Sequence, residues 1–228
     1  MKLIVNFILT ILVAGSSVSC SSAELCPAPG KNGEWSSACF EGKGPARQLK
    51  PKYISRIIPN KAGFATIMID RPRELVAVDQ KGVVKIPNIV HSGDFDFPSA
   101  ENGLGRFLIT LGNGPAKVVS KCGYFDSATF QIVIPARYDE CQAFNQGTAK
   151  VCQECKKYCT QPECQDSILV GGHGFIIDSK NTVLREFALP PLERACGDKQ
   201  PGKLTKGAGA ISYLQCTPAA NSPFGQLR

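Results

Sequence analysis

The chain has 228 residues, a formal net charge of +7, eleven cysteines and 43% hydrophobic residues. This apolar content excludes wholesale disorder, and the length suffices for one or two domains with a real core. The positive charge is modest and dispersed, which argues against nucleic-acid binding and favours acidic partners.

The first 23 residues have the order of a secretory signal peptide: Lys2, an apolar run over residues 3–14, and small residues up to Ala23. The apolar run is shorter than the roughly 20 residues that span a bilayer. We therefore predict cleavage before Glu24 and export. An alternative is lipidation at Cys20, because the residues before it resemble a bacterial lipobox, although the usual leucine is missing.

Ten cysteines remain once Cys20 is removed or lipidated, which is an even number. Ten thiols on an exported chain are most simply explained as five disulfides. The pairing cannot be deduced from sequence alone, and we adopt one hypothesis for it. The predicted bridges are Cys26–Cys39, Cys122–Cys141, Cys196–Cys216 and two local bridges among Cys152, Cys155, Cys159 and Cys164.

Residues 24–51 are predicted to form an N-terminal clasp. Cys26 and Cys39 flank a loop rich in Gly, Pro and Ser, and a polar segment of this kind can hardly bury itself without a bridge. The loop contains the single tryptophan of the chain, Trp35, which we expect to cover the edge of the neighbouring sheet.

A basic segment follows the clasp, with no acidic residue between Glu41 and Asp70. The simpler interpretation is a solvated edge strand that lysines guard against pairing with other chains. The alternative is a binding surface for anionic glycan or lipid headgroups. Lys50, Lys52 and Arg56 are the candidate binding residues.

Residues 52–187 are predicted to form a repeat array, because one phrase returns along them. The phrase consists of Gly-x-Ala-x-Val or a close relative, a strand that ends in aspartate, and a β-branched run that stops at proline. Its copies begin at Lys52, Asn88 and Ala136.

Each copy predicts a three-stranded antiparallel meander. Glycine lets another segment approach closely, the aspartate (Asp79, Asp126 or Asp178) caps backbone N–H groups in a turn, and proline ends the third strand because it cannot donate to a ladder. No stretch keeps a 3.6-residue apolar period for three turns, so helix should be minor. We predict an all-β fold whose meanders form an open solenoid or a propeller-like array.

The central copy resembles the WG repeat family of bacterial proteins, also called KWG. The family phrase reads roughly Trp-Gly-Tyr-Ile-Asp-x-x-Gly-x-x-Val-Ile-Pro-x-x-Tyr-Asp, followed by Phe-x-x-Gly-x-Ala-x-Val. The matching residues are Gly123, Tyr124, Phe125, Asp126, Ile134, Pro135, Tyr138, Asp139, Phe144, Gly147, Ala149 and Val151. Weaker copies cover Gly174 to Asp178 and Val78 to Pro87.

The chain departs from the family phrase at the tryptophan, whose place Cys122 and His173 take. We expect disulfides to replace the missing indole and His173 to be a packing residue. The resemblance implies an exported, non-catalytic scaffold of the bacterial envelope, in the periplasm or at the cell surface, that binds an unidentified protein or anionic envelope component.

Four cysteines interrupt the third copy: Cys152, Cys155, Cys159 and Cys164. In an oxidising compartment we expect two local disulfides that pin an inserted loop. Four thiolates at this spacing would also suit a tetrahedral Zn²⁺, so a zinc-binding protein is an alternative function. Cys152 and Cys155 have the spacing of a redox motif, but no helix N-terminus is evident to lower a thiol pKa.

His91, Asp94 and Asp96 offer nitrogen and oxygen ligands for a Ca²⁺ or transition-metal ion. The simpler interpretation is a linker whose carboxylates cap turns while Phe95 and Phe97 enter the core. The sequence contains no nucleophile elbow, phosphate loop, dinucleotide fingerprint or His-Glu-x-x-His motif. We therefore predict no catalysis and no cofactor, with a hydrolase that uses two carboxylates distant in sequence as a further alternative.

Residues 188–228 change in character and are predicted to form a C-terminal cap, because repeat arrays need atypical ends. Cys196–Cys216 would tie this cap, and residues 211–214 are its one strand candidate.

Overall fold

The computed structural model describes residues 26, 35–42, 44–70, 73–91, 103–111, 119–161, 164, 166–197, 202–206 and 212–216. The predicted signal peptide, residues 1–23, and Cys20 lie outside these residues.

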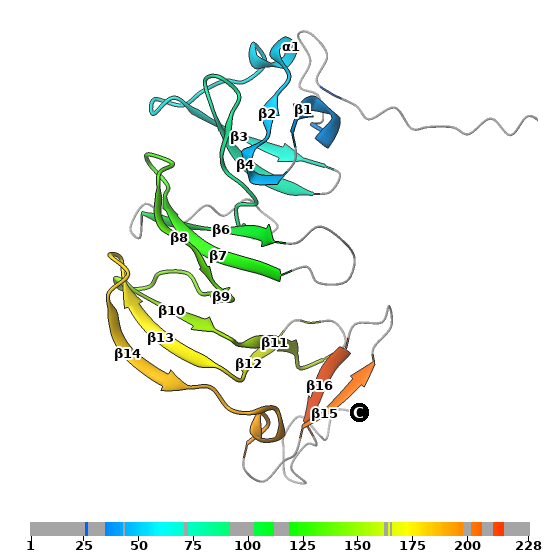
Figure 1. Cartoon of the computed structure of the whole chain (residues 1–228), viewed down its shortest axis with the longest axis vertical. Coiled ribbons are helices and arrows are strands. Elements are labelled where there is room, and N and C mark those ends of the chain that lie inside the picture. The colour runs from blue at the N-terminus through cyan, green and yellow to red at the C-terminus, as the bar shows by residue number, and fades with distance from the viewer. Residues whose placement is uncertain are drawn as a thin grey trace, which may run out of the picture.

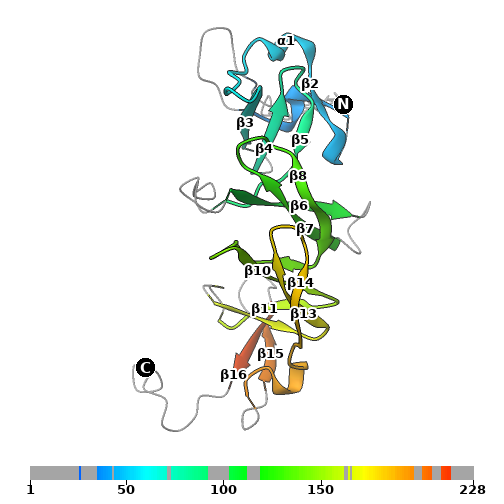
Figure 2. The same ribbon diagram turned by 90° about the vertical axis from the view of Figure 1, so that its left-hand side faces the viewer.

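Three small antiparallel sheets form the middle of the molecule, and we name them units 1, 2 and 3. Unit 1 consists of β3 (Phe64–Ile69), β4 (Glu74–Asp79) and β5 (Val84–Ile86); unit 2 of β6 (Leu104–Leu111), β7 (Val119–Asp126) and β8 (Ile132–Tyr138); unit 3 of β10 (Thr148–Gln153), β13 (His173–Asp178) and β14 (Val183–Ala188), with β9 (Glu140–Cys141) beside β10. The units follow one another along the long axis of the molecule (Figures 1 and 2). The all-β prediction is confirmed.

The turn between the second and third strands is built around the predicted aspartate in each unit. Asp79 Oδ1 accepts hydrogen bonds from two backbone N–H groups at 2.9 Å. Asp178 Oδ1 accepts two at 2.9 and 2.7 Å. Asp126 Oδ1 accepts the N–H groups of Ala128 and Thr129 and the Thr129 hydroxyl. These bonds, led by the one from the Thr129 N–H, hold the pKa of Asp126 below its usual value, and the bond from the Thr182 N–H does the same for the pKa of Asp178.

A β-bulge directly before this aspartate recurs in all three units. The register shifts between Ala77 and Val78 in unit 1, between Tyr124 and Phe125 in unit 2, and between Ile176 and Ile177 in unit 3. A bulge bends a strand and increases its twist, so each third strand leaves its unit in a similar direction.

A small residue on the first strand faces the large residue before the aspartate. Ala65 is paired with Val78, Gly105 with Phe125, and Ala149 with Ile177. The largest of the three side chains, Phe125, therefore faces the smallest residue, and a Cβ atom added to Gly105 would lie 2.3 Å from the Phe125 ring. This size matching is the physical reason for the Gly-x-Ala-x-Val phrase.

An aromatic stack joins units 1 and 2. Phe130 is buried in the turn of unit 2, and its ring centroid lies 5.4 Å from that of Phe64 on β3 and 5.8 Å from that of Phe125 on β7. Phe130 has a φ of +52°, a conformation that glycine adopts in the turn of unit 1, at Gly82. The stack offsets the strain of this left-handed residue through buried ring area.

A second core joins units 2 and 3 around Tyr124. Its ring lies edge-on to Phe144 with centroids 4.8 Å apart, and its hydroxyl donates to the Gln142 carbonyl at 2.7 Å. The Cys122–Cys141 disulfide lies in the same buried cluster. The place of the missing tryptophan is thus occupied by a disulfide, as predicted, and burial raises the pKa of Tyr124.

Gly123 allows a close approach within unit 2. A Cβ atom there would lie 2.4 Å from the Ile134 carbonyl oxygen of β8, so no side chain fits at this position. Unit 3 differs, because Gly174 lies one residue further from its turn aspartate than Gly123 does. The ring of Phe187 covers Gly174 instead.

The N-terminal clasp contains the 3-10 helices η1 (Ser37–Cys39) and η2 (Gly44–Ala46), the strands β1 (Phe40–Glu41) and β2 (Gln48–Leu49), and helix α1 (Pro51–Ile54). Leu49 N–H donates to the Gly82 carbonyl at 2.8 Å, so the clasp runs along the β5 edge of unit 1. Trp35 forms a backbone bridge to Ile69 at the opposite edge strand, β3, which confirms its predicted place.

The four-cysteine insertion is a hairpin of β11 (Lys156–Cys159) and β12 (Ser167–Val170), where a loop was expected. The chain end supplies η3 (Leu192–Arg194), β15 (Gly202–Lys206) and β16 (Ser212–Cys216). β16 pairs with β11 in parallel, so insertion and cap share one four-stranded sheet. Neither this sharing nor β15 was predicted.

Replacing Gly105 with alanine should destabilise the protein by about 1–3 kcal/mol, because the added methyl overlaps the Phe125 ring. The double variant Gly105→Ala/Phe125→Val copies the Ala65–Val78 pair and should recover about 1 kcal/mol relative to the sum of the single variants. Urea denaturation of all three variants measures this coupling. Strict additivity would show that the pair does not interact.

Replacing Thr129 with valine should lower the free energy of unfolding by roughly 0.5 kcal/mol near neutral pH, since Asp126 loses its hydroxyl donor in an exposed turn. Asp126 has a lowered pKa when folded, so its contribution is present above the unfolded pKa of about 4 and is lost as the pH falls through the folded pKa. The difference between variant and parent should therefore shrink in acid. Thr66→Val on an exposed strand position is the matched control and should show no such pH dependence.

Candidate functional site

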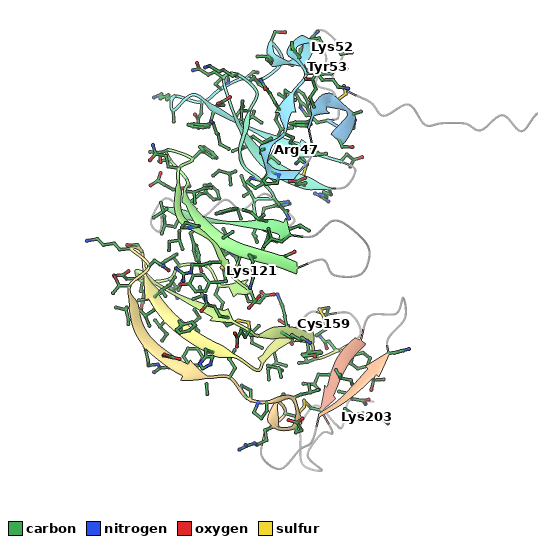
Figure 3. The ribbon with its side chains drawn as sticks, in the orientation of Figure 1. Arg47, Lys52, Tyr53, Lys121, Cys159 and Lys203 are labelled. Carbon is green, nitrogen blue, oxygen red and sulfur yellow. A yellow bond between two sulfur atoms is a disulfide. The ribbon has the colours of Figure 1, made fainter. Side chains whose placement is uncertain are left out.

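The basic residues predicted as a binding surface lie at one end of the molecule, around α1. Figure 3 shows Lys52 and Tyr53 at this end, opposite Lys203. The predicted edge strand is wrong here, because residues 51–54 form a helical turn with Pro51 at its first position. Proline is pre-set for a helix start and cannot donate to a sheet, which explains the difference.

The charge of this basic surface is not balanced by nearby acids. Among the residues that the structure describes, Lys50, Lys52, Arg56 and Lys61 make no ion pair. The Nε atom of Arg56 is buried and has no hydrogen-bond partner in the described part of the chain. A buried N–H group without an acceptor is costly, so this Nε atom is a local weak point of the clasp.

An aromatic pair supports the basic surface from within. The Lys52 ammonium lies 4.9 Å from the ring centroid of Tyr53, and Tyr53 meets Trp35 edge-on at 6.5 Å. Cys26, bonded to Cys39, packs against the same core. The clasp disulfide and the aromatic pair therefore fix the backbone that presents the cations.

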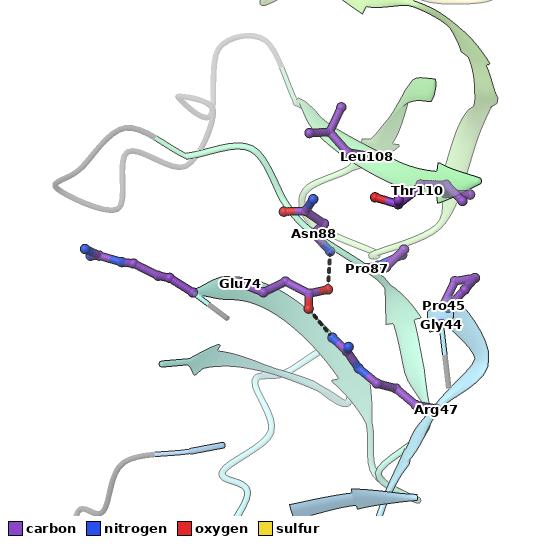
Figure 4. Close-up of a pocket in the computed structure, with 10 residues that line it drawn as sticks. Gly44, Pro45, Arg47, Glu74, Pro87, Asn88, Leu108 and Thr110 are labelled. Carbon is purple, nitrogen blue, oxygen red and sulfur yellow. Dashed lines mark hydrogen bonds and ion pairs between the residues drawn. The ribbon is translucent and has the colours of Figure 1, made fainter. Parts of the chain in front are cut away.

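A small pocket of about 260 Å³ lies where the clasp, unit 1 and unit 2 meet (Figure 4). Arg47 Nη2 lies 2.5 Å from Glu74 Oε2, and the Asn88 N–H donates to Glu74 Oε1 at 3.1 Å. Leu108 and Thr110 of β6 form part of the opposite wall. Among the described residues that line this pocket, Glu74 is the only carboxylate, and its pairing with Arg47 makes it structural, because the pair joins the clasp to β4.

Sequence reasoning missed a polar position that recurs in each unit. Glu74, Lys121 and His173 each stand five residues before the turn aspartate of their unit. Glu74 forms an ion pair with Arg47 at 2.5 Å and Lys121 with Asp139 at 2.7 Å, and His173 Nδ1 lies 2.9 Å from Glu186 Oε1. The common offset from the aspartate was the signal that would have found them.

His173 is not the packing residue that the sequence suggested. Its side chain is 57% exposed and bonds to Glu186 across the β13–β14 pair. Counted back from the turn aspartate, Gly174 and not His173 occupies the position of Cys122, which explains the error.

The candidate metal ligands Asp94 and Asp96 lie outside the described residues, and so do Phe95 and Phe97. His91 is described and precedes them in the chain. In the part of the chain that the structure describes, no group of three or more His, Cys, Asp or Glu side chains is placed to hold a metal ion.

The four inserted cysteines are bonded in pairs as Cys152–Cys155 and Cys159–Cys164. The first pair closes the turn between β10 and β11, and the second follows β11. The other bridges are Cys26–Cys39, Cys122–Cys141 and Cys196–Cys216, which are the predicted pairs. Zinc requires thiolates, so the zinc alternative would need this hairpin in a reduced state.

These contacts define a class of protein in which small β-sheets are joined in series. The family model of the WG containing repeat matches residues 123–158, which run from β7 of unit 2 through β8, β9 and β10 into β11. The chain is thus a WG-repeat-containing protein. No curated protein and no solved structure matched the chain in the corresponding searches. Among the described residues, no helix is long and apolar enough to cross a membrane.

Intact-mass measurement of the native protein under non-reducing conditions should give a mass lower than the fully reduced one by about ten hydrogen atoms, two for each of the five disulfides. Alkylation without reductant is the control and should label none of the ten cysteines. Labelling confined to Cys152, Cys155, Cys159 and Cys164, together with bound zinc, would instead support the metal-binding alternative.

Proposed function

We propose that this protein is an exported, non-catalytic binding module of the bacterial envelope, located in the periplasm or at the cell surface. The observation that carries the proposal is the distribution of its disulfides. They occur in the clasp, between units 2 and 3, in the inserted hairpin and in the cap. Disulfides in this number are typical of exported proteins, because oxidising surroundings preserve them and the cytosol of most cells reduces them.

The binding role is supported by the basic surface around α1, whose cations lack acidic partners among the described residues. Its partner in this proposal is an anionic component of the envelope or an acidic protein, and not nucleic acid. In this proposal the mature protein starts at Glu24, and attachment through a lipid at Cys20 is the alternative to that cleavage. The alternatives of a zinc-binding protein and a secreted hydrolase stay predictions, and no contact in the described residues favours either of them.

Fractionation of cells that produce the full chain tests this proposal. We expect an oxidised mature protein without its first 23 residues in the envelope or periplasmic fraction. Replacing Cys20 with serine should release it from membranes if a lipid is attached there. A reduced, uncleaved chain in the cytosol would contradict export.

The triple variant Lys50→Gln/Lys52→Gln/Arg56→Gln should reduce retention in the washed envelope fraction at low salt, because these cations are exposed or partly exposed. Lys203→Gln/Lys206→Gln, at the opposite end of the molecule, is the matched control. Equal retention of both variants would show that the basic surface does not mediate attachment.

A further inference from the structure

One aliphatic side chain stands out at the basic end of the molecule. Ile58, four residues beyond α1, is 89% exposed, whereas the other exposed large hydrophobic residues that the structure describes lie between 43% and 56%. A single exposed apolar residue is ordinary on a protein surface. This one is surrounded in sequence by Lys52, Arg56 and Lys61 and by no acid, which is the composition of a membrane-facing segment.

The backbone on both sides of Ile58 is held by contacts and hydrogen bonds. Ile54 and Ile57 pack against the buried core of the clasp, and the Ile57 N–H donates to the Ile54 carbonyl at 3.2 Å. On the other side, the Asn60 side chain accepts the N–H groups of Ala62 and Phe64 at 2.9 and 3.1 Å. Both flanks are therefore anchored, and little further ordering is needed when Ile58 meets a surface.

The combination favours a lipid surface over a soluble polyanion. A glycan chain would engage the cations alone and would leave Ile58 in water. A bilayer with anionic headgroups attracts the cations and also takes the isoleucine side chain into the boundary between headgroups and acyl chains. Tyr53, which contacts both the Lys52 ammonium and the Trp35 ring, has the amphipathic aromatic character that suits this boundary.

The alternative of a lipid anchor at Cys20 would place the attachment point at the same end of the molecule as this surface. Cys26 packs against the same core as Tyr53, and Cys20 precedes it by six residues. Six extended residues span at most about 20 Å. An anchor at Cys20 would therefore hold this end of the molecule beside the membrane.

We infer that the surface formed by Lys50, Lys52, Arg56, Ile58 and Lys61 docks on an anionic lipid bilayer, with Ile58 as its apolar contact. This inference rests on the proposed envelope function and names the partner of its basic surface.

Vesicle binding of the mature protein tests the inference. Every protein used starts at Glu24, so that no acyl chain contributes. We expect sedimentation with vesicles of phosphatidylcholine and phosphatidylglycerol, and little with phosphatidylcholine alone. Ile58→Ser should lower the partition coefficient about tenfold, and Lys50→Gln/Lys52→Gln roughly twentyfold.

Two matched controls use residues far from this surface. Leu184→Ser removes another exposed aliphatic side chain, and Lys203→Gln/Lys206→Gln removes two exposed lysines near the opposite end. Both should bind like the parent.

The inference would be overturned if the Leu184 control or the Lys203/Lys206 control weakened vesicle binding as much as Ile58→Ser does, because the membrane contact would then lie elsewhere. So would binding that Ile58→Ser leaves unchanged, or a protein that ignores the vesicles and binds a soluble anionic polysaccharide. Any of these results would leave the proposed envelope function intact if fractionation still finds the protein in the envelope. A reduced protein in the cytosol would contradict both the envelope function and the docking on a bilayer.

Discussion

The structure depends on the burial of apolar layers between successive sheets. A sheet with apolar side chains on both faces must bury each face against a further layer. The central strand of unit 1 shows this need, since four consecutive residues of β4, from Leu75 to Val78, are buried. Residues on its two faces belong to two different cores, one shared with the clasp and one shared with unit 2. Each unit is therefore stable only as a neighbour of the next.

The boundaries of the repeat in the sequence do not coincide with the boundaries of the sheets. The matched segment contributes strands to both unit 2 and unit 3, and its contacts hold these two sheets together. The matched segment begins in the second strand of unit 2 and continues through the first strand of unit 3. The matched segment therefore supplies residues from both sheets to the core between units 2 and 3. Tyr124 donates to Gln142, Lys121 pairs with Asp139, and Cys122 is bonded to Cys141, all across the two sheets. A sequence copy of this family phrase is thus a joint between sheets and not a sheet.

Four of the five disulfides lie outside the cores that join the three units. The clasp and the cap each have one, and the inserted hairpin, whose small core contains few buried residues, has two near it, whereas Cys122–Cys141 lies in the buried core between units 2 and 3. A bridge stabilises mainly by restricting the unfolded chain, so it works even in a segment that buries little apolar area. The Cys26–Cys39 disulfide also bears on the basic surface, because it restrains the clasp that leads into α1.

The sequence by itself determined those features that arise from residues close together in the chain. The aspartate turns, the short bridges and the order of strands within a unit follow from turn chemistry and from a period of two. The prediction that proline ends the third strand holds for β5, which stops before Pro87, and is wrong for β8, which continues through Pro135 to Tyr138. Tertiary structure alone decided which segments meet from afar: the pairing of β11 with β16, the Arg47–Glu74 contact, and the match of Gly105 with Phe125. Local patterns specify which residues can form a strand, but not which distant strand or side chain will cover it, because that choice depends on the shape and volume left by all the others.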